Sequence, residues 1–169
     1  MATKPEILDA ALDVLRSGVS LTLDAVAREA GLTKPGVVHH FATKEALSLA
    51  VLDHLLDRWE QELRARAGED ASAGDRLRAY AEHTLLGDMD AADLALLADP
   101  KLRDKLSARC SERMSEWFGD SRDPRLVAAR LVADGAWIDR CLGLLDLDET
   151  ERADTAALVA SLIAEGDAS

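Results

Sequence analysis

The chain has 169 residues, enough for a small module and one modest helical core but too few for two large independent domains. Aromatic residues make up only 4% of it, while an Ala- and Leu-rich apolar share of 48% favours helices over a strand-rich fold. The net charge of −12 disfavours a protein that attracts polyanions over its whole surface.

No stretch approaches the roughly 18 consecutive apolar residues of a membrane span, and Met1–Glu6 lacks the basic and apolar regions of a signal peptide. We therefore expect a cytoplasmic protein without a membrane partner. Cys110 and Cys141 lie far apart and form no Cys-x-x-Cys motif, so we expect two ordinary buried thiols. Neither a metal site nor a cofactor is indicated.

The N-terminal segment has apolar residues at helical spacing, namely Ile7, Leu8, Ala11, Val14 and Leu15. Thr3 can cap this helix, Pro5 suits its first turn and Glu6 completes a capping box. A first helix is therefore predicted from about Lys4 to a stop at Gly18.

Two short helices are predicted next. Thr22 caps the first of them, and Gly31 supplies the left-handed residue that a tight exit requires. Thr33 caps the second, in which Pro35 is acceptable in the first turn. The apolar residues that mark its inward side are Val37 and Phe41.

A long helix is predicted from Lys44 to about Arg66, with Thr43 as its cap. It carries two apolar stripes, one of Leu47, Val51 and Leu55, the other of Leu49, Leu52, Leu56, Trp59 and Leu63. Two stripes imply two packing partners, so we interpret this helix as the mechanical link between the N-terminal helices, the head, and the helices that follow it, the body.

The remainder reads as a helical body that follows a small polar loop over 67–74. The predicted helices are Asp75–Leu86, Ala91–Ala98, Pro100–Phe118, Pro124–Leu145 and Glu149–Glu165, the last capped by Asp148 with Glu151. We expect an all-α fold of about nine helices, divided into a three-helix domain over 1–47 and a helical domain over 48–169.

Small residues recur on the last two predicted helices, at Ala128, Ala129, Gly135, Ala136 and Gly143, and then at Ala153, Ala156, Ala157 and Ala160. Such stripes let helices approach closely, which favours a homodimer formed through these two helices. Close packing inside one monomer is the alternative.

The segment from Thr22 to Leu47 has the layout of a helix-turn-helix, whose second helix enters the major groove of DNA. It also resembles the TetR family of bacterial regulators over roughly the first 56 residues. The matching features are Thr22, Val26-Ala27, Ala30-Gly31, Thr33-Lys34-Pro35-Gly36, His40-Phe41 and Thr43-Lys44-Glu45-Ala46-Leu47. The family usually has a phosphate-contacting Tyr where this chain has Val38.

The resemblance implies a set of contacts with double-stranded DNA. Phosphates would be met by Thr22, Thr33 and Lys44. Base edges would be met by Lys34, Pro35, Gly36 and His39, and His40 would serve both packing and the DNA backbone. Arg28 either reaches the groove edge or is a solvated charge. Adjacent His39 and His40 point about 100° apart on a helix, so they do not chelate one metal.

The resemblance also implies an apolar cavity for a small-molecule effector in the helical body. We expect Trp59, Tyr80 and Trp117 in its wall and Arg113 or His83 as a polar anchor, plain core packing being the alternative reading. The implied mechanism is repression: a two-fold dimer occupies a palindromic operator until the effector changes the spacing of its recognition helices.

Two other classes of function compete with a regulator. An enzyme is disfavoured because the chain has no Gly-x-Ser-x-Gly, phosphate-binding loop or His-Glu-x-x-His motif. A helical ligand-binding or adaptor protein that has lost DNA binding is the alternative, since Met1–Leu47 holds five Lys/Arg against six Asp/Glu, net −1, and has Val38 in place of Tyr. Weak non-specific attraction to phosphates follows from that charge.

Overall fold

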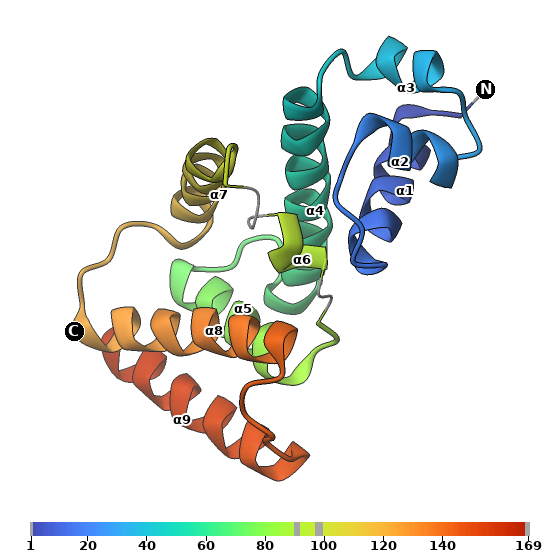
Figure 1. Cartoon of the computed structure of the whole chain (residues 1–169). Helices are drawn as coiled ribbons and strands as arrows, with labels where there is room; N and C mark the ends of the chain where they lie inside the picture. The colour runs from blue at the N-terminus through green and yellow to red at the C-terminus, as the bar shows by residue number, and fades with distance from the viewer. Residues whose placement is uncertain (1, 90–91, 97–99, 168–169) are drawn as a thin grey trace. The chain divides into compact units, whose positions relative to one another are not determined.

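The computed structural model describes residues 2–89, 92–96 and 100–167 (Figure 1). Regular structure in these ranges is helical, which confirms the predicted all-α fold. The helices are α1 (Lys4–Arg16), α2 (Leu23–Glu29), α3 (Lys34–His40), α4 (Lys44–Ala67), α5 (Ala73–Leu86), α6 (Ala92–Ala95), α7 (Arg103–Phe118), α8 (Pro124–Leu142) and α9 (Glu149–Asp167).

The chain divides into two compact units. The first comprises Met1–Arg58 with Asp90–Cys110, and the second comprises Trp59–Met89 with Ser111–Ser169. Helices α4 and α7 each contribute residues to both units. The domain boundary expected after Leu47 therefore lies inside the first unit.

Helix α1 of the first unit begins as the sequence predicts. The Thr3 hydroxyl accepts a bond from the backbone N–H of Glu6, and the Glu6 carboxylate accepts one from the N–H of Thr3 at 2.6 Å. The helix ends at Arg16, two residues before the expected stop, and Gly18 follows with a φ of +74°.

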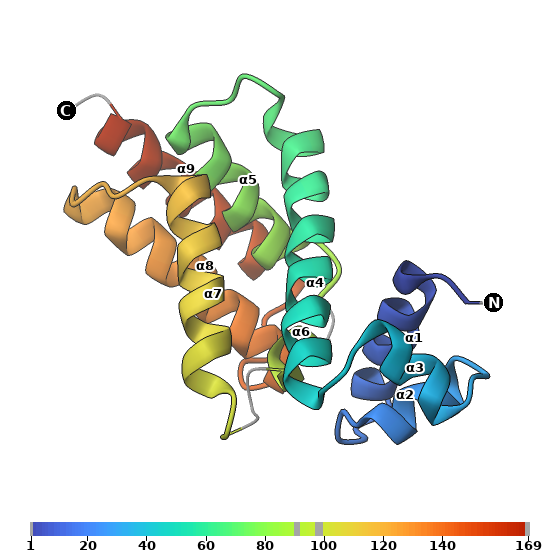
Figure 2. The same ribbon diagram turned by 90° about the horizontal axis from the view of Figure 1, so that it is seen from above.

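The next three helices also start at the predicted caps. The hydroxyls of Thr22, Thr33 and Thr43 accept bonds from backbone N–H groups three residues ahead, at 3.0, 3.3 and 3.0 Å. Between α2 and α3 the chain turns at Gly31, whose φ of +64° suits a residue without a side chain. Figure 2 shows α1, α2 and α3 gathered in one cluster.

Ion pairs join α4 to α7 within the first unit. Arg109 Nε donates to Asp53 Oδ1 at 2.8 Å, and Lys105 pairs with Glu45. The prediction that α7 begins at Pro100 is wrong, because the first helical bond there is accepted by the carbonyl of Leu102. The helix expected over 91–98 corresponds in part to α6; positions 91 and 97–98 lie outside the described residues.

In the second unit, α5, α8 and α9 pack against one another (Figure 2). Helix α5 starts at Ala73 rather than Asp75, because Ser72 and Asp75 form a capping box. Ser72 lies within the polar loop that the sequence predicts over 67–74. Helix α8 ends at Leu142 rather than Leu145, because Gly143 adopts a φ of +64° and closes it. Its last helix is capped as predicted, by Asp148 with Glu151.

No helix in the described ranges is long and apolar enough to cross a membrane. Cys110 and Cys141 form no disulfide, and both are half-buried rather than buried as expected.

Candidate functional site

Helix α3 has one inward and one outward side. Val37 is fully buried, and Phe41, directly after the helix, is buried with it. The outward residues are exposed: Thr33, Lys34, Pro35, Val38 and His39. A helix of this kind is anchored by few apolar contacts and leaves most of its side chains available to another molecule.

The threonine caps keep a donor for a phosphate. In both Thr22 and Thr33 the hydroxyl oxygen accepts a backbone N–H bond, which uses a lone pair. A hydroxyl has one proton and two lone pairs, so capping leaves its O–H able to donate. Structural capping and phosphate contact are therefore compatible at these two positions.

Lys34 is held by an acidic neighbour. Its Nζ donates to Asp24 Oδ2 at 2.8 Å, and both side chains are more than half exposed. The pair joins the start of α3 to α2. An exposed ion pair is weak, so a DNA phosphate or base can compete for the ammonium group, although the carboxylate lowers the local positive potential.

Gly36 is not required by the fold. A Cβ at this position would lie 3.5 Å from Thr33 Oγ1 and 3.8 Å from Leu32 Cβ, which is ordinary contact. Its φ is not among the positive ones. Glycine is less favourable than alanine in a helix, and no contact at position 36 requires it, so the fold itself does not explain the missing side chain.

The two histidines at the end of α3 differ in environment. His39 is exposed, whereas His40 is half-buried, with its ring centroid 6.4 Å from that of Phe41. Their own rings meet edge to face at 5.4 Å. Lys4 Nζ lies 5.5 Å from the centre of the Phe41 ring. In the described ranges no group of three His, Cys, Asp or Glu side chains could hold a metal ion.

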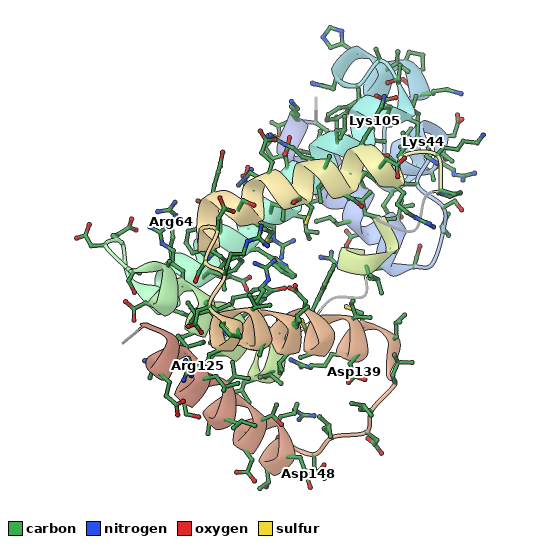
Figure 3. All side chains as sticks on the ribbon, turned by 90° about the vertical axis from the view of Figure 1, so that its left-hand side faces the viewer. Lys44, Arg64, Lys105, Arg125, Asp139 and Asp148 are labelled. Atoms are coloured by element: carbon green, nitrogen blue, oxygen red, sulfur yellow. The ribbon has the colours of Figure 1, made fainter. Side chains whose placement is uncertain are left out.

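Two further basic residues complete the predicted DNA-contacting set. Arg28 is exposed in the last turn of α2. Lys44 is exposed at the start of α4, where Figure 3 labels it. Together with the exposed residues of α3, they belong to the first unit.

The predicted effector residues lie in the second unit, around the core of α5. Trp59, Tyr80 and Trp117 belong to one buried cluster. The Trp59 ring is 5.9 Å from that of Tyr80 and 5.7 Å from that of Trp137. The Tyr80 hydroxyl donates to Asp134 Oδ1 at 2.8 Å.

His83 is buried beside Trp59, their ring centroids 5.5 Å apart. Its Nδ1 is 3.5 Å from Glu62 Oε2, and neither ring nitrogen has a hydrogen-bond partner. Burial is the main cause that lowers the pKa of His83 below 6.5; the negative charge of Glu62 opposes it, and the positive charge of Arg66 adds to it. His83 is therefore neutral at pH 7.

Arg113, the other predicted anchor, donates to Glu60 Oε2 at 2.7 Å. Glu60 also accepts a bond from Arg64 at 2.5 Å, and this bond is the largest cause that lowers the pKa of the Glu60 carboxyl. The Glu60 carboxylate thus links the Arg113 and Arg64 guanidiniums.

The core has features that sequence reasoning missed. The Arg130 guanidinium lies 4.2 Å from the centre of the Phe118 ring and 5.1 Å from that of Tyr80. The indole N–H groups of Trp117 and Trp137 are buried without a hydrogen-bond partner. Contacts across such long sequence separations leave no local spacing signal, although Trp137 is conspicuous as one of three tryptophans.

Two family models match the chain. One, described as "Bacterial regulatory proteins, tetR family", covers residues 7–51, and the other, "Tetracyclin repressor-like, C-terminal domain", covers residues 74–164. The first match includes α2, α3 and the start of α4, which carry the exposed site.

Curated relatives match over part of their length. The HTH-type transcriptional regulator BetI of Brucella anthropi is 33% identical over 76 residues, 44% of this chain and 39% of that protein. The HTH-type transcriptional regulator RutR of Escherichia coli K12 is 42% identical over 66 residues, 38% of this chain and 31% of that one. These relatives are regulators of transcription, not enzymes.

A solved structure agrees in fold over nearly the whole chain. The multidrug binding protein EbrR, complexed with malachite green, has a TM-score of 0.64 at 22% sequence identity, covering 95% of this chain and 98% of that one. Sequence matches at both ends and this shared fold lead to one conclusion: the chain belongs to the TetR family of bacterial regulatory proteins.

Proposed function

We propose that this protein represses transcription by holding a palindromic DNA operator with α3 and releasing it when a small-molecule effector binds the second unit. The observation that carries the proposal is the half-buried Gly36 beside the exposed side of α3, at a position where the fold does not need a glycine. Without a side chain at this position, the backbone of α3 can approach the base edges of DNA closely.

The DNA contacts follow from the chemistry of each side chain. We assign phosphates to Thr22, Thr33 and Lys44, with Arg28 and His40 beside them. We assign the contacts with base edges to the exposed side of α3. Lys34 would donate to guanine O6 or N7, Pro35 would touch a thymine methyl, and His39 would contact base edges next to Gly36.

Two-fold pairing would supply the second recognition helix. Apolar side chains lie exposed along α8 and α9, with Leu131 at 65%, Leu142 at 56% and Leu158 at 62% exposed. If a second copy covers them, binding to a palindromic operator would require the two α3 helices of the dimer to lie about 34–36 Å apart, one turn of DNA. The small residues divide between roles, since Ala129 and Ala156 are buried within the monomer while Gly135 and Ala157 are exposed.

For the effector we propose contacts with the predicted residues Trp59, Tyr80, His83, Arg113 and Trp117. Support comes from the unpartnered nitrogens of His83 and Trp117, which a polar group of a bound compound would satisfy. Effector and operator then compete through one coupling free energy, typically about 1–3 kcal/mol. Three tryptophans in the same unit provide a fluorescence signal for binding.

The test is an anisotropy titration of the full chain against DNA from upstream of its own gene, with unrelated DNA as competitor. We expect site preference and a steep dependence on salt. Gly36→Ala should be at least as stable to heat as the wild type, because its Cβ meets only ordinary contacts. It should bind the operator more weakly by about as much as one mismatched base pair costs, about 1–3 kcal/mol per half-site. A folded protein without site preference, or Gly36→Ala with wild-type affinity, would refute the proposal.

A further inference from the structure

A pocket of about 520 Å³ opens in the second unit between α5, α8 and α9. Its apolar lining comes from Leu85, Val132, Ala136, Ile138, Leu144 and Leu145. This volume lies within the range of sites that hold drug-sized molecules. None of the five predicted effector residues lines it.

The pocket exists because α8 and α9 are close at one end and apart at the other. At the close end, a Cβ on Gly166 would lie 2.8 Å from Leu126 Cγ, so any side chain there would force Leu126 to move. Arg125 pairs with Glu165 at 3.4 Å at the same end. Figures 1 and 3 show the two helices diverging toward the 143–148 connection, between the labelled Asp139 and Asp148.

Hydrogen bonds hold the connection at the open end. The N–H of Gly143 donates to the carbonyl of Asp139 at 2.7 Å, and the N–H of Leu145 donates to the Asp139 carboxylate at 2.7 Å. Leu144 and Leu145 are nevertheless 67% and 63% exposed. Two leucines kept in solvent at the rim of an apolar pocket indicate a surface that has an occupant.

The polar side of the pocket is cationic. Arg140 donates to the carbonyl of Thr84 at 3.0 Å and Arg152 to that of Leu147 at 2.5 Å, both through Nη1. Across the described ranges, neither guanidinium lies in an ion pair with a carboxylate, although the chain has 32 acidic residues. The Asp139 carboxylate, also in the lining, accepts the Leu145 N–H and keeps its negative charge, so the charged side chains of the lining are two cations and one anion.

The two guanidiniums also repel one another. Burial, and after it the positive charge of Arg152, lowers the pKa of Arg140, while the exposed Asp88 opposes this. Each arginine uses one of its five N–H donors on a backbone carbonyl, so several remain for a ligand. An anion between them would relieve the repulsion and complete the hydrogen bonding.

We propose that this pocket binds an amphipathic organic anion, with its apolar body against Val132, Ala136 and Leu85 and its carboxylate on Arg140 and Arg152. Binding of this anion does not depend on whether the protein binds DNA. Only a role for the anion as the effector that releases DNA would rest on the proposed function. Gly135 and Ile138 also line the pocket and lie on the exposed side of α8, where a second copy of the chain is the competing occupant.

The test uses calorimetric titration of the full chain with decanoate below its micelle concentration and with decanol, its uncharged analogue. We expect decanoate to bind and decanol to bind at least about tenfold more weakly, because charge-assisted hydrogen bonds are lost. Arg140→Gln and Arg152→Gln should each weaken decanoate about tenfold or more. Arg122→Gln, which removes an exposed arginine of the same unit, should not.

Several results would overturn the proposal. One is equal affinity for decanoate and decanol, and another is equal weakening by Arg122→Gln. A third is the absence of decanoate binding. If Arg140→Gln in addition dissociates a dimer in sedimentation, the pocket is instead filled by a second copy of the chain. Should the glutamine variants fail to fold, Arg140→Lys and Arg152→Lys replace them and should also weaken decanoate binding. Decanoate should then raise the melting temperature of the wild type more than decanol does, and equal shifts would overturn the proposal. Operator affinity without ligand reports the proposed function separately.

Discussion

The ion pair between Lys34 and Asp24 allows the DNA-contacting role of α3 to be tested by a gain of affinity. Asp24→Asn removes a carboxylate that lies 2.8 Å from the Lys34 ammonium group. In the free protein an exposed pair of this kind is worth about 0.2–1 kcal/mol. If DNA must displace Asp24 at both heads of a dimer, the variant gains about 0.4–2 kcal/mol, or roughly 2- to 30-fold tighter operator binding.

The assay is fluorescence anisotropy on operator DNA at two salt concentrations, combined with a double-mutant cycle. The gain should shrink at higher salt, since exposed charges are screened. It should vanish in the Lys34→Ala background, because Asp24 acts through Lys34. Asp13→Asn, which removes the acid of an exposed pair with Arg16 on α1, is the matched control and should change little. Unchanged or weaker binding by Asp24→Asn would refute the reasoning.

The remaining predictions concern assembly and stability. Leu131→Asp should shift a dimer to monomer in sedimentation, since burying a leucine contributes about 1.5–3 kcal/mol per copy. Val19→Asp, at an exposed residue of the first unit, should not. A dimer that survives Leu131→Asp would contradict pairing through α8 and α9. Gly31→Ala should lower the free energy of unfolding in urea by about 1–2 kcal/mol, because its φ of +64° strains a residue with a side chain. An unchanged urea midpoint would show that no such strain exists. Because the pKa of folded His83 lies below 6.5, the unfolded chain binds a proton first, so stability should fall as the pH drops below 6.5 by up to about 1.4 kcal/mol per pH unit. His83→Leu should lose this part of the pH dependence, and an identical profile would contradict it.

The head could be predicted from sequence because its signals are local. Each of Thr3, Thr22, Thr33 and Thr43 caps a helix through an N–H three residues ahead, and Gly31 turns the chain where the sequence places it. Such interactions lie within a few residues, so reading the sequence finds them. The outward side of α3 follows from one buried position, Val37.

The body was harder to predict because its determinants are long-range. Ser72 with Asp75 is a local cap that the expected polar loop concealed. By contrast, Tyr80 meets Asp134 across 54 residues, and Arg140 meets the Thr84 carbonyl across 56. No spacing rule brings such residues together, so the pocket beside Arg140 and Arg152 could not be derived from the sequence.

The most direct measurement is a nuclease footprint of the full chain on the DNA upstream of its own gene. The account predicts a protected palindrome with half-sites about one helical turn apart, and loss of that protection in Gly36→Ala. A folded, dimeric protein that protects no sequence at low salt, or a Gly36→Ala variant that protects the same site equally, would contradict it.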